Sequence, residues 1–476
     1  MKKLTLSLIL VLLVSIDGCG QNVNEPSTNN ENKVVKFWLT DASKGIKFQQ
    51  QFNNVDTGRV SNETTIKINN GFLGQFMDGF GFALTGGSAK HIHNMSTTSR
   101  SKLLTELFDV DDSNIGISYL RVSIGASDLD EYVFSYNDLS TGETDVNMEK
   151  FSLSEDRKHL IPVLKEILNI NPNIKIMGSP WSAPTWMKTN NNSIGGSLKS
   201  IYYDAYAKYF VKYIQSMTEE GITIDAITVQ NEPLHGGNNP SMVMQPNEQA
   251  TFIKNNLGPM FNDSGINTKI IIYDHNADRT DYPITVLNDP MAKQYIDGTA
   301  FHLYGGTIDD LSLVHNAHPD RNLYFTEQWI GAPGNFEQDI KWHVRELIIG
   351  ATRNWCKNVI EWNLAADENQ EPHTPGGCDR CLGALTITGN QVTRNPAYYV
   401  IAHASKFVRP GSQRVYSSVS IELPNVAFNT SENQYVIIVL NDTNEQKSFN
   451  ISIEEKVINS TLSSGAVGTY IWDIEN

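Results

Sequence analysis

An apolar run that ends in a polar pair and a proline lies near the middle of the chain: Ile224-Asp225-Ala226-Ile227-Thr228-Val229-Gln230-Asn231-Glu232-Pro233. Its β-branched residues are typical of a buried strand. Because Pro233 cannot continue a central strand, the chain must turn there, which leaves Asn231 and Glu232 at the carboxyl end. A carboxylate in that position is costly unless it has a partner or a function. We therefore expect Glu232 to act as a general acid, and the alternative is a structural carboxylate paired with Arg121.

Seven further strand-like runs surround this one, and together they predict an α/β barrel. The eight runs centre on Met77–Phe80, Ser118–Val122, Lys175–Gly178, Ala226–Val229, Ile270–Tyr273, Thr299–His302, Leu323–Thr326 and Val359–Glu361. Segments of helical period separate most of them, most clearly Thr97–Phe108, Asp156–Leu168, Ile201–Glu219, Asn247–Phe261 and Phe336–Asn354. This alternation indicates a (β/α)8 TIM barrel over residues 71–407. A doubly wound sheet is the alternative, but no Gly-rich phosphate loop follows the first strand.

Short β-rich segments flank the barrel on both sides. After Arg409-Pro410-Gly411, which signals a boundary, they are Ser417–Leu423, Val426–Asn429, Tyr435–Asn441, Lys447–Ile453 and Tyr470–Asp473. Five strands make an incomplete β-sandwich over residues 408–476. Residues 34–70 hold two more alternating segments, Val35–Thr40 and Thr64–Ile68. We therefore predict a sandwich built from both ends of the chain.

The first residues have the pattern of a targeting signal. Lys2 and Lys3 precede an apolar region, Leu4–Val14, that is too short to span a bilayer. Residues 1–19 resemble a bacterial lipoprotein signal in which Cys19 becomes lipidated, and the alternative is an ordinary secretory signal. Residues 20–33 are polar and Asn-rich, which suits a flexible tether. We expect an exported lipoprotein on the outer membrane or in the periplasm, or else a secreted protein.

Three other cysteines follow the signal, so at most one disulfide can form among them. Cys378-Asp379-Arg380-Cys381 has the spacing of redox and zinc sites. A second Cys or His pair at zinc spacing is absent from the sequence, which weakens the metal interpretation. In an exported protein, a local disulfide between Cys378 and Cys381 that clamps a loop is favoured.

Composition and charge narrow the class of substrate. The 476 residues carry a formal net charge of −16, which by charge alone disfavours nucleic acids and anionic membranes. A neutral substrate such as a sugar is compatible with that charge. The chain also has 8 Trp, 18 Tyr and 19 Phe, some of which can stack on sugar rings while most form the core. We expect a monomer whose only membrane attachment is its lipid anchor.

The predicted strand ends carry polar and aromatic residues, and function in such barrels lies at the carboxyl ends of the strands. In chain order these ends supply Asp78, Arg121 with Asp128, Trp181, Asn231 with Glu232, His302 with Tyr304, Glu327 with Trp329, and Glu361 with Trp362. Carboxylates, amides and indoles around one cup are the chemistry of a sugar site. A metal site would need His and Asp ligands on several strand ends, so we expect neither metal nor cofactor.

Glu327 is the second acid of interest because it follows the apolar run Leu323–Thr326. Strands four and seven lie on opposite sides of an eight-stranded barrel, so Glu232 and Glu327 can face each other across the cavity. Cleavage of a glycosidic bond uses such a pair, one acid to protonate the leaving oxygen and one carboxylate on the other side of the anomeric carbon.

Several stretches match one known family in order along the chain: Gly79–Thr85, Tyr119–Ser123, Gly178–Lys188, Thr228–Pro233, Phe325–Glu327, Glu361–Ala365 and Gly468–Trp472. On these motifs the chain from about Val34 onward resembles glycoside hydrolase family 30, the family of the glucosylceramidases and bacterial β-1,6-glucanases. The Ser-Pro-Trp-Ser-Ala-Pro-Thr-Trp-Met-Lys segment at 179–188 is the most specific motif. Asn-Glu-Pro alone is shared by a larger clan of (β/α)8 retaining glycosidases.

The resemblance implies a role for each matched residue. Glu232 corresponds to the acid/base and Glu327 to the nucleophile of a two-carboxylate double displacement. Asn231 corresponds to the amide that bonds the sugar 2-hydroxyl, and Arg121 to the arginine near the nucleophile. Sugar-binding positions are matched by Asp128, Trp181, Tyr304 and Trp362, with Trp329 beside them at a strand end. His302 corresponds to a histidine on strand six, and a core residue with satisfied hydrogen bonds is the alternative.

We expect an endo-β-1,6-glucanase whose acid, Glu232, has its pKa raised by burial near an ionised Glu327. The Gly376–Gly383 loop resembles that of bacterial members related to the β-1,6-glucanases, and at the mouth of the site it can shape the leaving-group side. A glucosylceramidase or β-glucosidase is one alternative and a β-xylosidase another. An inactive glycan-binding surface lipoprotein is an alternative of a different class, but it would have lost one of the two acids.

Overall fold

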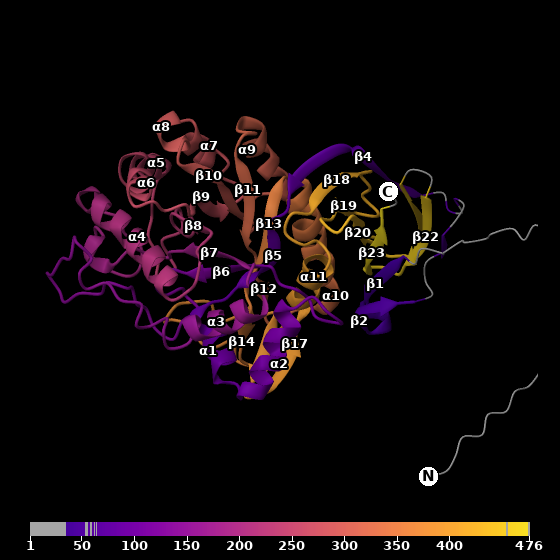
Figure 1. The fold of residues 1–476 in the computed structure, drawn as a ribbon, viewed down its shortest axis with the longest axis horizontal. Coiled ribbons are helices and arrows are strands. Elements are labelled where there is room, and N and C mark those ends of the chain that lie inside the picture. Colours follow the sequence, from indigo (N-terminus) through magenta and orange to yellow (C-terminus); the bar gives the residue numbers. More distant parts are fainter. Residues whose placement is uncertain are drawn as a thin grey trace, which may run out of the picture. The chain divides into compact units, whose positions relative to one another are not determined.

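Eight parallel strands close into a barrel in the order β10-β11-β13-β5-β6-β7-β8-β9 (Figure 1). They are β5 (Gly79–Ala83), β6 (Tyr119–Ser123), β7 (Lys175–Ser179), β8 (Ala226–Thr228), β9 (Lys269–Asn276), β10 (Ile296–His302), β11 (Asn322–Glu327) and β13 (Cys356–Asn363). The predicted (β/α)8 barrel is confirmed, since each strand overlaps a predicted run. The structure is a computed structural model that describes residues 35–52, 56–57, 60, 62, 64–453 and 456–474.

One strand end was predicted wrongly. β5 begins at Gly79, so Asp78 precedes the first strand instead of ending it. Its carboxylate bonds Lys175 Nζ at 3.0 Å, at the start of β7. The predicted strand was placed too early, at Met77–Phe80, whereas the apolar strand runs from Gly79 to Ala83 and the polar Asp78 comes just before it.

The helices cover the outside of the barrel strands. They are α1 (Gly86–Asn94), α2 (Thr97–Phe108), α3 (Leu160–Ile170), α4 (Tyr203–Glu219), α5 (Pro246–Phe252), α6 (Gly258–Asp263), α7 (Asp281–Leu287), α8 (Pro290–Lys293), α9 (Leu311–Ala317), α10 (Phe336–His343) and α11 (Pro396–Ser405). Two π-helical segments continue them, η4 (Ile253–Leu257) and η6 (Val344–Ala351). Short 3-10 turns and strand pairs lie in the loops: η1 (Ala42–Lys44), η2 (Thr185–Met187), η3 (Ser200–Tyr202), η5 (Ile308–Asp310), β12 (Ile330–Gly331), β14 (Ala365–Ala366), β15 (Cys381–Leu382), β16 (Leu385–Thr388) and β17 (Gln391–Arg394).

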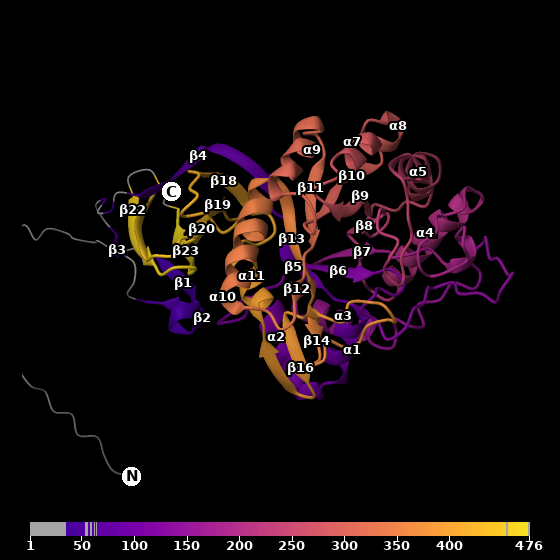
Figure 2. The same cartoon turned by 180° about the vertical axis from the view of Figure 1, so that it is seen from behind.

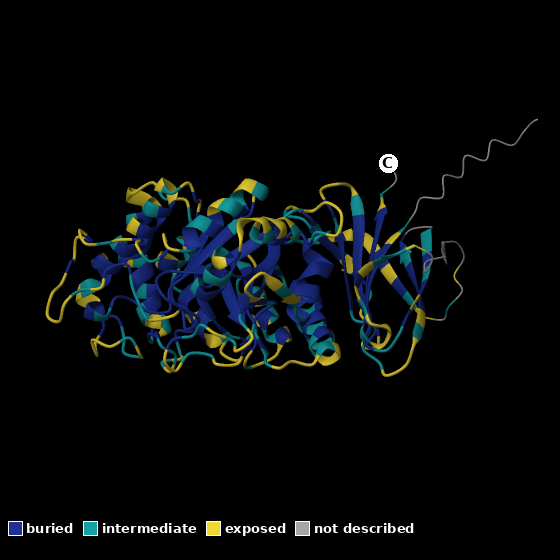
Figure 3. Cartoon of the chain, turned by 90° about the horizontal axis from the view of Figure 1, so that it is seen from below, coloured by how far each residue is buried: buried dark blue, intermediate teal, exposed yellow. Residues whose placement is uncertain are grey.

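The barrel interior is packed with side chains rather than open. One buried layer takes a residue from each of seven strands: Tyr119, Met177, Ala226, Ile271, Ala300, Tyr324 and Ile360. Figure 3 shows the strands and the inner faces of the helices buried, with exposed residues on the loops and outer helix faces. A filled barrel leaves only its two rims for a site.

The second layer is a ten-stranded sheet of order β2-β1-β23-β20-β19-β18-β4-β21-β22-β3. The amino-terminal segment supplies β1 (Lys36–Asp41), β2 (Ile46–Gln51), β3 (Asp56–Thr57) and β4 (Thr65–Phe76), and the carboxyl-terminal segment supplies β18 (Gln413–Ser417), β19 (Asn425–Asn429), β20 (Gln434–Leu440), β21 (Lys447–Ile453), β22 (Lys456–Leu462) and β23 (Val467–Asp473). β1 pairs with β23, and β4 pairs with both β18 and β21. Both chain ends therefore build the sandwich, as the fold prediction states.

The strand predicted at Ser417–Leu423 is wrong. β18 ends at Ser417, and the following residues form a loop in which Val419 and Ile421 point to solvent. The Ser420 hydroxyl accepts a bond from the Leu423 N–H, a local bond that competes with strand pairing. The sequence prediction also missed β22, whose polar residues hide its alternation.

Helices α10 and α11 lie between the barrel and the sheet (Figures 1 and 2). His403 of α11 is fully buried and bonds Thr40 of β1 and Thr469 of β23, each at 2.8 Å. Burial lowers the pKa of His403 to about 3, so it is neutral and can serve one hydroxyl as donor and the other as acceptor. This residue therefore fixes the barrel against strands from both chain ends.

The predicted signal (1–19), the tether (20–33) and Cys19 lie outside the described residues. Within the described part of the chain, no helix is long and apolar enough to cross a membrane.

Candidate active site

A cavity of about 360 Å³ opens at the carboxyl ends of the barrel strands. Its lining residues are Asp128, Trp181, Glu232, Leu234, His235, Asn238, His275, Asn276, Tyr304, Glu327, Trp329, Trp362, Cys378 and Cys381. Seven of these were predicted from the sequence as catalytic or sugar-binding residues. The three others are buried beside the lining: Arg121 bonds Glu327 and Asn231, and His302 bonds Glu232. The side chains predicted at the strand ends therefore lie together around one cavity, and their roles stay a prediction.

Glu232 is held in an unusual backbone conformation. Its φ of +45° is rare for a residue other than glycine and costs conformational energy. Three backbone bonds keep it there: its N–H donates to Asp274 O (2.9 Å), its carbonyl accepts from His235 N–H (2.8 Å), and Asn231 N–H donates to Pro180 O (2.8 Å). The turn that Pro233 enforces thus aims the Glu232 side chain into the cavity.

Glu327 is bound to a buried arginine. Arg121 Nη1 donates to Glu327 Oε2 at 2.6 Å, and Tyr304 OH donates to Glu327 Oε1 at 2.9 Å. The same guanidinium donates to Asn231 Oδ1 at 2.7 Å. The alternative in which Arg121 pairs with Glu232 is not what the structure has, because Glu327 takes that place.

The two carboxylates face each other across the cavity. One oxygen of Glu232, one of Glu327 and a nitrogen of His302 all lie within 4.8 Å of one another. Carboxyl groups about 5 to 5.5 Å apart characterise retaining glycosidases, whereas inverting enzymes leave about 6.5 to 9.5 Å for a water. In the described part of the chain, this is the one trio of metal-ligating side chains so close together.

Asp274 contacts Arg121 and His302 at the centre of the site, and the sequence interpretation missed it. It is fully buried, and it accepts bonds from Arg121 Nη2 (2.9 Å), Thr228 Oγ1 (2.6 Å) and Thr326 Oγ1 (2.7 Å). Tyr273 and Asp274 have φ of +71° and +64°, and the pairing of β9 with β10 shifts register close to this point. A polar Asp-His-Asn triplet directly after the apolar run 270–273 was the available signal.

His302 lies between Asp274 and the two candidate acids. Its Nε2 is 3.0 Å from Asp274 Oδ1, and its Nδ1 is 3.4 Å from Glu232 Oε1. Burial opposes protonation of His302, but the surrounding carboxylates outweigh it and raise its pKa to about 9. His302 is therefore a charged member of the site, not a neutral core residue.

The expectation that burial raises the pKa of Glu232 is wrong. Burial does act in that direction, but the bond to His302 and its positive charge outweigh burial and lower the pKa of Glu232. Burial also fails to protonate Asp274, because Arg121 and His302 lower its pKa far below the ordinary value. A proton thus resides on His302 beside Glu232, within reach of that acid.

Indoles form the apolar part of the wall. Trp181 and Trp362 lie with ring centroids 5.4 Å apart, and Arg121 lies over both rings. Asp128 is buried beside them, and burial, together with the charges of Glu327 and Glu232, raises its pKa to about 7. A sugar ring needs both an apolar face and hydroxyl acceptors, and this wall offers both.

Two further sequence predictions have distinct outcomes. The predicted Cys378–Cys381 disulfide forms, and Cys356 is a free, buried thiol. Glu361, by contrast, is buried away from the cavity and accepts a 2.7 Å bond from His343 of α10. The residues of β13 alternate between the two faces of the strand, so Glu361 faces the helices while Trp362 faces the cavity.

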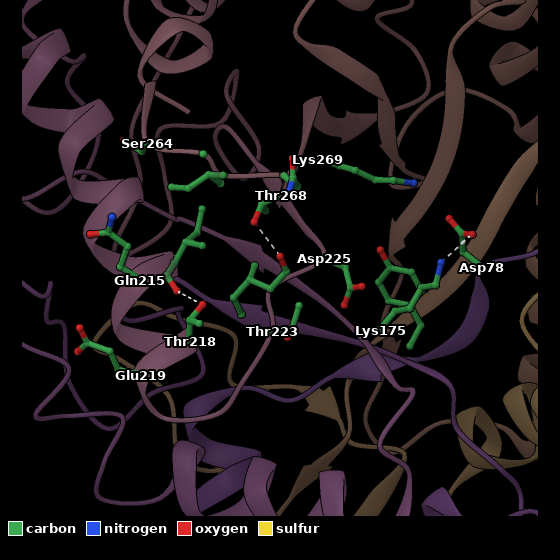
Figure 4. A pocket seen from close by; sticks show the side chains of 16 residues that line it. Asp78, Lys175, Gln215, Thr218, Glu219, Thr223, Asp225, Ser264, Thr268 and Lys269 are labelled. Atoms are coloured by element: carbon green, nitrogen blue, oxygen red, sulfur yellow. Dashed lines mark hydrogen bonds and ion pairs between the residues drawn. The ribbon is translucent and has the colours of Figure 1, made fainter. Parts of the chain in front are cut away.

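A larger cavity of about 670 Å³ lies at the opposite rim, at the amino ends of the strands (Figure 4). Asp78 and Lys175 line it and are paired with each other, and Lys269 pairs with Asp297 at 3.5 Å. Residues at this rim of the fold serve stability. The smaller cavity holds the facing carboxylates and the polarised histidine, so we assign the active site to it.

Comparison with known proteins gives one consistent result. Residues 77–408 match the glycosyl hydrolase family 30 TIM-barrel domain, and residues 411–470 match the family 30 β-sandwich domain. An endo-1,6-β-D-glucanase of Neurospora crassa is 36% identical over 351 residues, 71% of each chain. The lysosomal acid glucosylceramidase of Mus musculus is 29% identical over 426 residues, 84% of this chain and 81% of that one.

A solved structure extends the likeness to the whole fold. The endo-β1,6-glucanase BT3312 has a TM-score of 0.86 and 35% identity, and the match covers 93% of this chain and all of that one. With two family domains matched in order over most of its length, and a facing pair of acids at the expected strand ends, the chain belongs to glycosyl hydrolase family 30.

Proposed function

We propose that this family 30 glycoside hydrolase is a retaining endo-β-1,6-glucanase with Glu327 as nucleophile and Glu232 as acid/base. The observation that carries the mechanism is the approach of one oxygen of Glu232 and one of Glu327 within 4.8 Å, which is too close for a water between Glu327 and the anomeric carbon. The relatives named endo-1,6-β-glucanase, at 36% and 35% identity, support the linkage.

In the first step, Glu327 attacks the anomeric carbon and forms a glycosyl ester. Its Oε2 accepts a bond from Arg121 and its Oε1 accepts one from Tyr304, so the carboxylate is oriented before the sugar arrives. Glu232 gives its proton to the leaving oxygen. His302 Nδ1, 3.4 Å from Glu232 Oε1, passes its proton to Glu232 as Glu232 donates, so the step leaves His302 neutral and Glu232 ionised, ready to act as a base.

In the second step, Glu232 takes a proton from water, and the hydroxide displaces Glu327 from the anomeric carbon. Two inversions give retention. Asn231 is fixed by Arg121 with its amide nitrogen free to face the sugar 2-hydroxyl. Asp128, Trp181 and Trp362 hold the remaining sugar face, with Trp329 and Tyr304 at the rim of the cavity.

The lining on the Glu232 side supports a sugar as leaving group. His235, Asn238 and His275 lie around this acid, and Asn238 Nδ2 is 3.4 Å from Glu232 Oε2. The buried Nδ1 of His275 has no hydrogen-bond partner within the described residues, and Glu232 Oε1 lies 3.9 Å from it. Hydroxyls of a second sugar can satisfy these groups, whereas the alkyl chains of a ceramide would leave them unpaired.

A glycan panel tests the proposal: β-1,6-glucan, β-1,3-glucan, glucosylceramide, and aryl β-glucosides and β-xylosides. Release of short oligosaccharides from β-1,6-glucan is the expected result. The matched control is the Glu327→Gln variant, which removes one charge and keeps the shape. Turnover of glucosylceramide or aryl glycosides with none on β-1,6-glucan would refute the assignment and favour the glucosylceramidase, β-glucosidase or β-xylosidase alternatives.

For location and assembly, the proposal rests on the sequence. The signal-like residues 1–19 support export and lipidation at Cys19, and the acidic, glycan-directed chain suits an outer-membrane or periplasmic monomer. Incorporation of labelled fatty acid into the wild type but not into Cys19→Ser is expected. A wild type that incorporates no label would contradict the anchor, and a sedimentation mass of two chains would contradict the monomer.

A further inference from the structure

The Cys378–Cys381 disulfide forms part of the active-site wall. Both cysteines line the cavity, and Cys381 packs in a buried cluster with Trp181 and Trp362. This cluster is separate from the large barrel core. Trp181 and Trp362 within it, and Trp329 packed against it, line the cavity together with the two cysteines. A change in the conformation of the cystine would therefore change the shape of the cavity wall.

The segment around the cystine, residues 374–383, ties together loops from four barrel strands. The Thr374 N–H donates to Asp128 O (2.9 Å), and the Asn239 side chain donates to Pro375 O (3.0 Å). On the other side, the Asn363 side chain donates to Cys381 O, and β15 pairs with β12 in the loop after β11. The segment is thus laid across strand ends that carry Asp128, Glu232, Glu327 and Trp362.

One bond from this segment reaches a site carboxylate directly. The Cys378 backbone N–H donates to Asp128 Oδ2 at 3.3 Å. Asp128 is buried and faces the negative charges of Glu327 and Glu232, and its ionised form is favoured by the Cys378 N–H. Tyr304 is the other titratable group that interacts with it. The position of residue 378 therefore helps to orient the Asp128 carboxylate.

The backbone before Cys378 does not fix that position by itself. Gly376 has φ of +85°, and a side chain at Gly377 would come within 2.4 Å of Asp128 O. Two glycines allow this close approach, but they also leave the segment conformationally free. A disulfide closed over a separation of three residues constrains little of the unfolded chain, so its main effect is local.

We propose that the Cys378–Cys381 disulfide is a positioning element of the sugar pocket, which holds the Cys378 N–H on the Asp128 carboxylate and is needed for full activity. The inference rests on the proposed function in one respect, namely that Asp128 faces the sugar. Its consequence is a redox-sensitive enzyme. A dithiol such as dithiothreitol would reduce the S–S bond to two thiols, and it would be oxidised to its cyclic disulfide in an exchange of two electrons and two protons.

The test compares oxidised and dithiothreitol-reduced wild type on the same substrate, with thiol labelling to confirm reduction. We expect kcat/KM to fall about tenfold, the effect of losing one hydrogen bond to a buried charge. Cys378→Ser/Cys381→Ser should show the same fall, and reductant should not change it further. A further tenfold loss in that double variant on adding reductant would show that the effect arises elsewhere and would overturn the proposal.

The same measurement on a second variant distinguishes an effect of the disulfide on Asp128 from a general loss of structure. If the disulfide acts through Asp128, reduction should have little effect on an Asp128→Ala variant, because the bond that it protects is already gone. An equal tenfold loss in wild type and Asp128→Ala would overturn the proposal, as would unchanged kcat/KM in reduced wild type. Thermal unfolding of each sample verifies that the compared proteins are folded.

The redox test of the disulfide can be carried out whether or not β-1,6-glucan is the substrate. The oxidised-to-reduced ratio is measured on whichever substrate of the panel the wild type cleaves. An oxidised wild type that leaves β-1,6-glucan intact would refute the proposed function, and the redox ratio would then decide this inference on the substrate that is cleaved.

Discussion

Replacement of Asp274 by Asn is expected to move the alkaline limit of activity. Asp274 Oδ1 accepts a bond from His302 Nε2 at 3.0 Å, and both groups are fully buried. The variant keeps the shape and loses the charge. If His302 must be protonated to supply Glu232, activity is present below the pKa of His302 and is lost as the pH rises through it.

The expected shift in the pKa of His302 follows from the strength of its hydrogen bond to Asp274. A hydrogen bond to a charged group is worth about 1.5 to 3 kcal/mol, and one pKa unit corresponds to about 1.4 kcal/mol. The pKa of His302, about 9 in the wild type, should therefore fall by about one to two units in Asp274→Asn. The alkaline limb of kcat/KM should move from near pH 9 to roughly pH 7 to 8.

The assay is the pH dependence of kcat/KM for a soluble substrate, followed between pH 4 and 10. Partial unfolding lowers the whole curve without moving its midpoint, so the midpoint is the quantity to compare. Glu361→Gln is a matched control, because it removes a carboxylate from another buried Glu–His pair, at His343, away from the cavity. An alkaline limb that stays near pH 9 in Asp274→Asn would refute the role given to His302.

Three further predictions concern the acids and the junction with the sandwich. Glu327→Gln should lower kcat by about 10⁴-fold or more, and azide should rescue Glu327→Gly with the inverted glycosyl azide; NMR showing a retained azide would reject Glu327 as nucleophile. Glu232→Gln should lose activity on glycosides with poor leaving groups while an activated dinitrophenyl glycoside still forms the glycosyl-enzyme in a burst; equal losses on both substrates would argue against the acid role. His403→Ala should lower the free energy of unfolding in urea by about 2 to 4 kcal/mol, because it leaves a cavity and the buried hydroxyls of Thr40 and Thr469 without partners; a loss under about 0.5 kcal/mol would contradict its role at the junction.

The charge pattern at the centre of the site explains why these effects are coupled. Two cations, Arg121 and protonated His302, lie among three carboxylates, Asp274, Glu327 and Glu232. The site is therefore one negative charge away from balance. A proton that moves between His302 and Glu232 changes where the excess charge lies. Formation of the ester neutralises Glu327 while the His302–Glu232 pair gives up its proton, so the excess charge moves from Glu327 to that pair.

The elements of the fold were predicted well where each segment carries its own apolar pattern. The eight strands, the facing acids and the contribution of both chain ends to the sandwich follow from apolar periodicity and from strand ends that carry acids. These features depend on local sequence, because burial on both faces forces a continuous apolar run in each barrel strand. The chemistry of Glu232 and Glu327 then follows from their place at the ends of such runs.

The features that the sequence left open depend on contacts between strands. Asp274 enters the centre of the site because Tyr273 and Asp274 adopt positive φ beside a register shift, which no local apolar pattern encodes. The lowered pKa of Glu232 arises from His302, 70 residues away in the chain, which outweighs burial.

The sequence by itself determined the fold class, the pair of acids and the family to which the chain belongs. Only the tertiary structure decided the charge of each group in the site and the placement of the cystine against Asp128. The physical reason is that apolar patterning is a property of single segments, whereas a pKa and a hydrogen bond depend on which side chains several segments bring within a few ångströms.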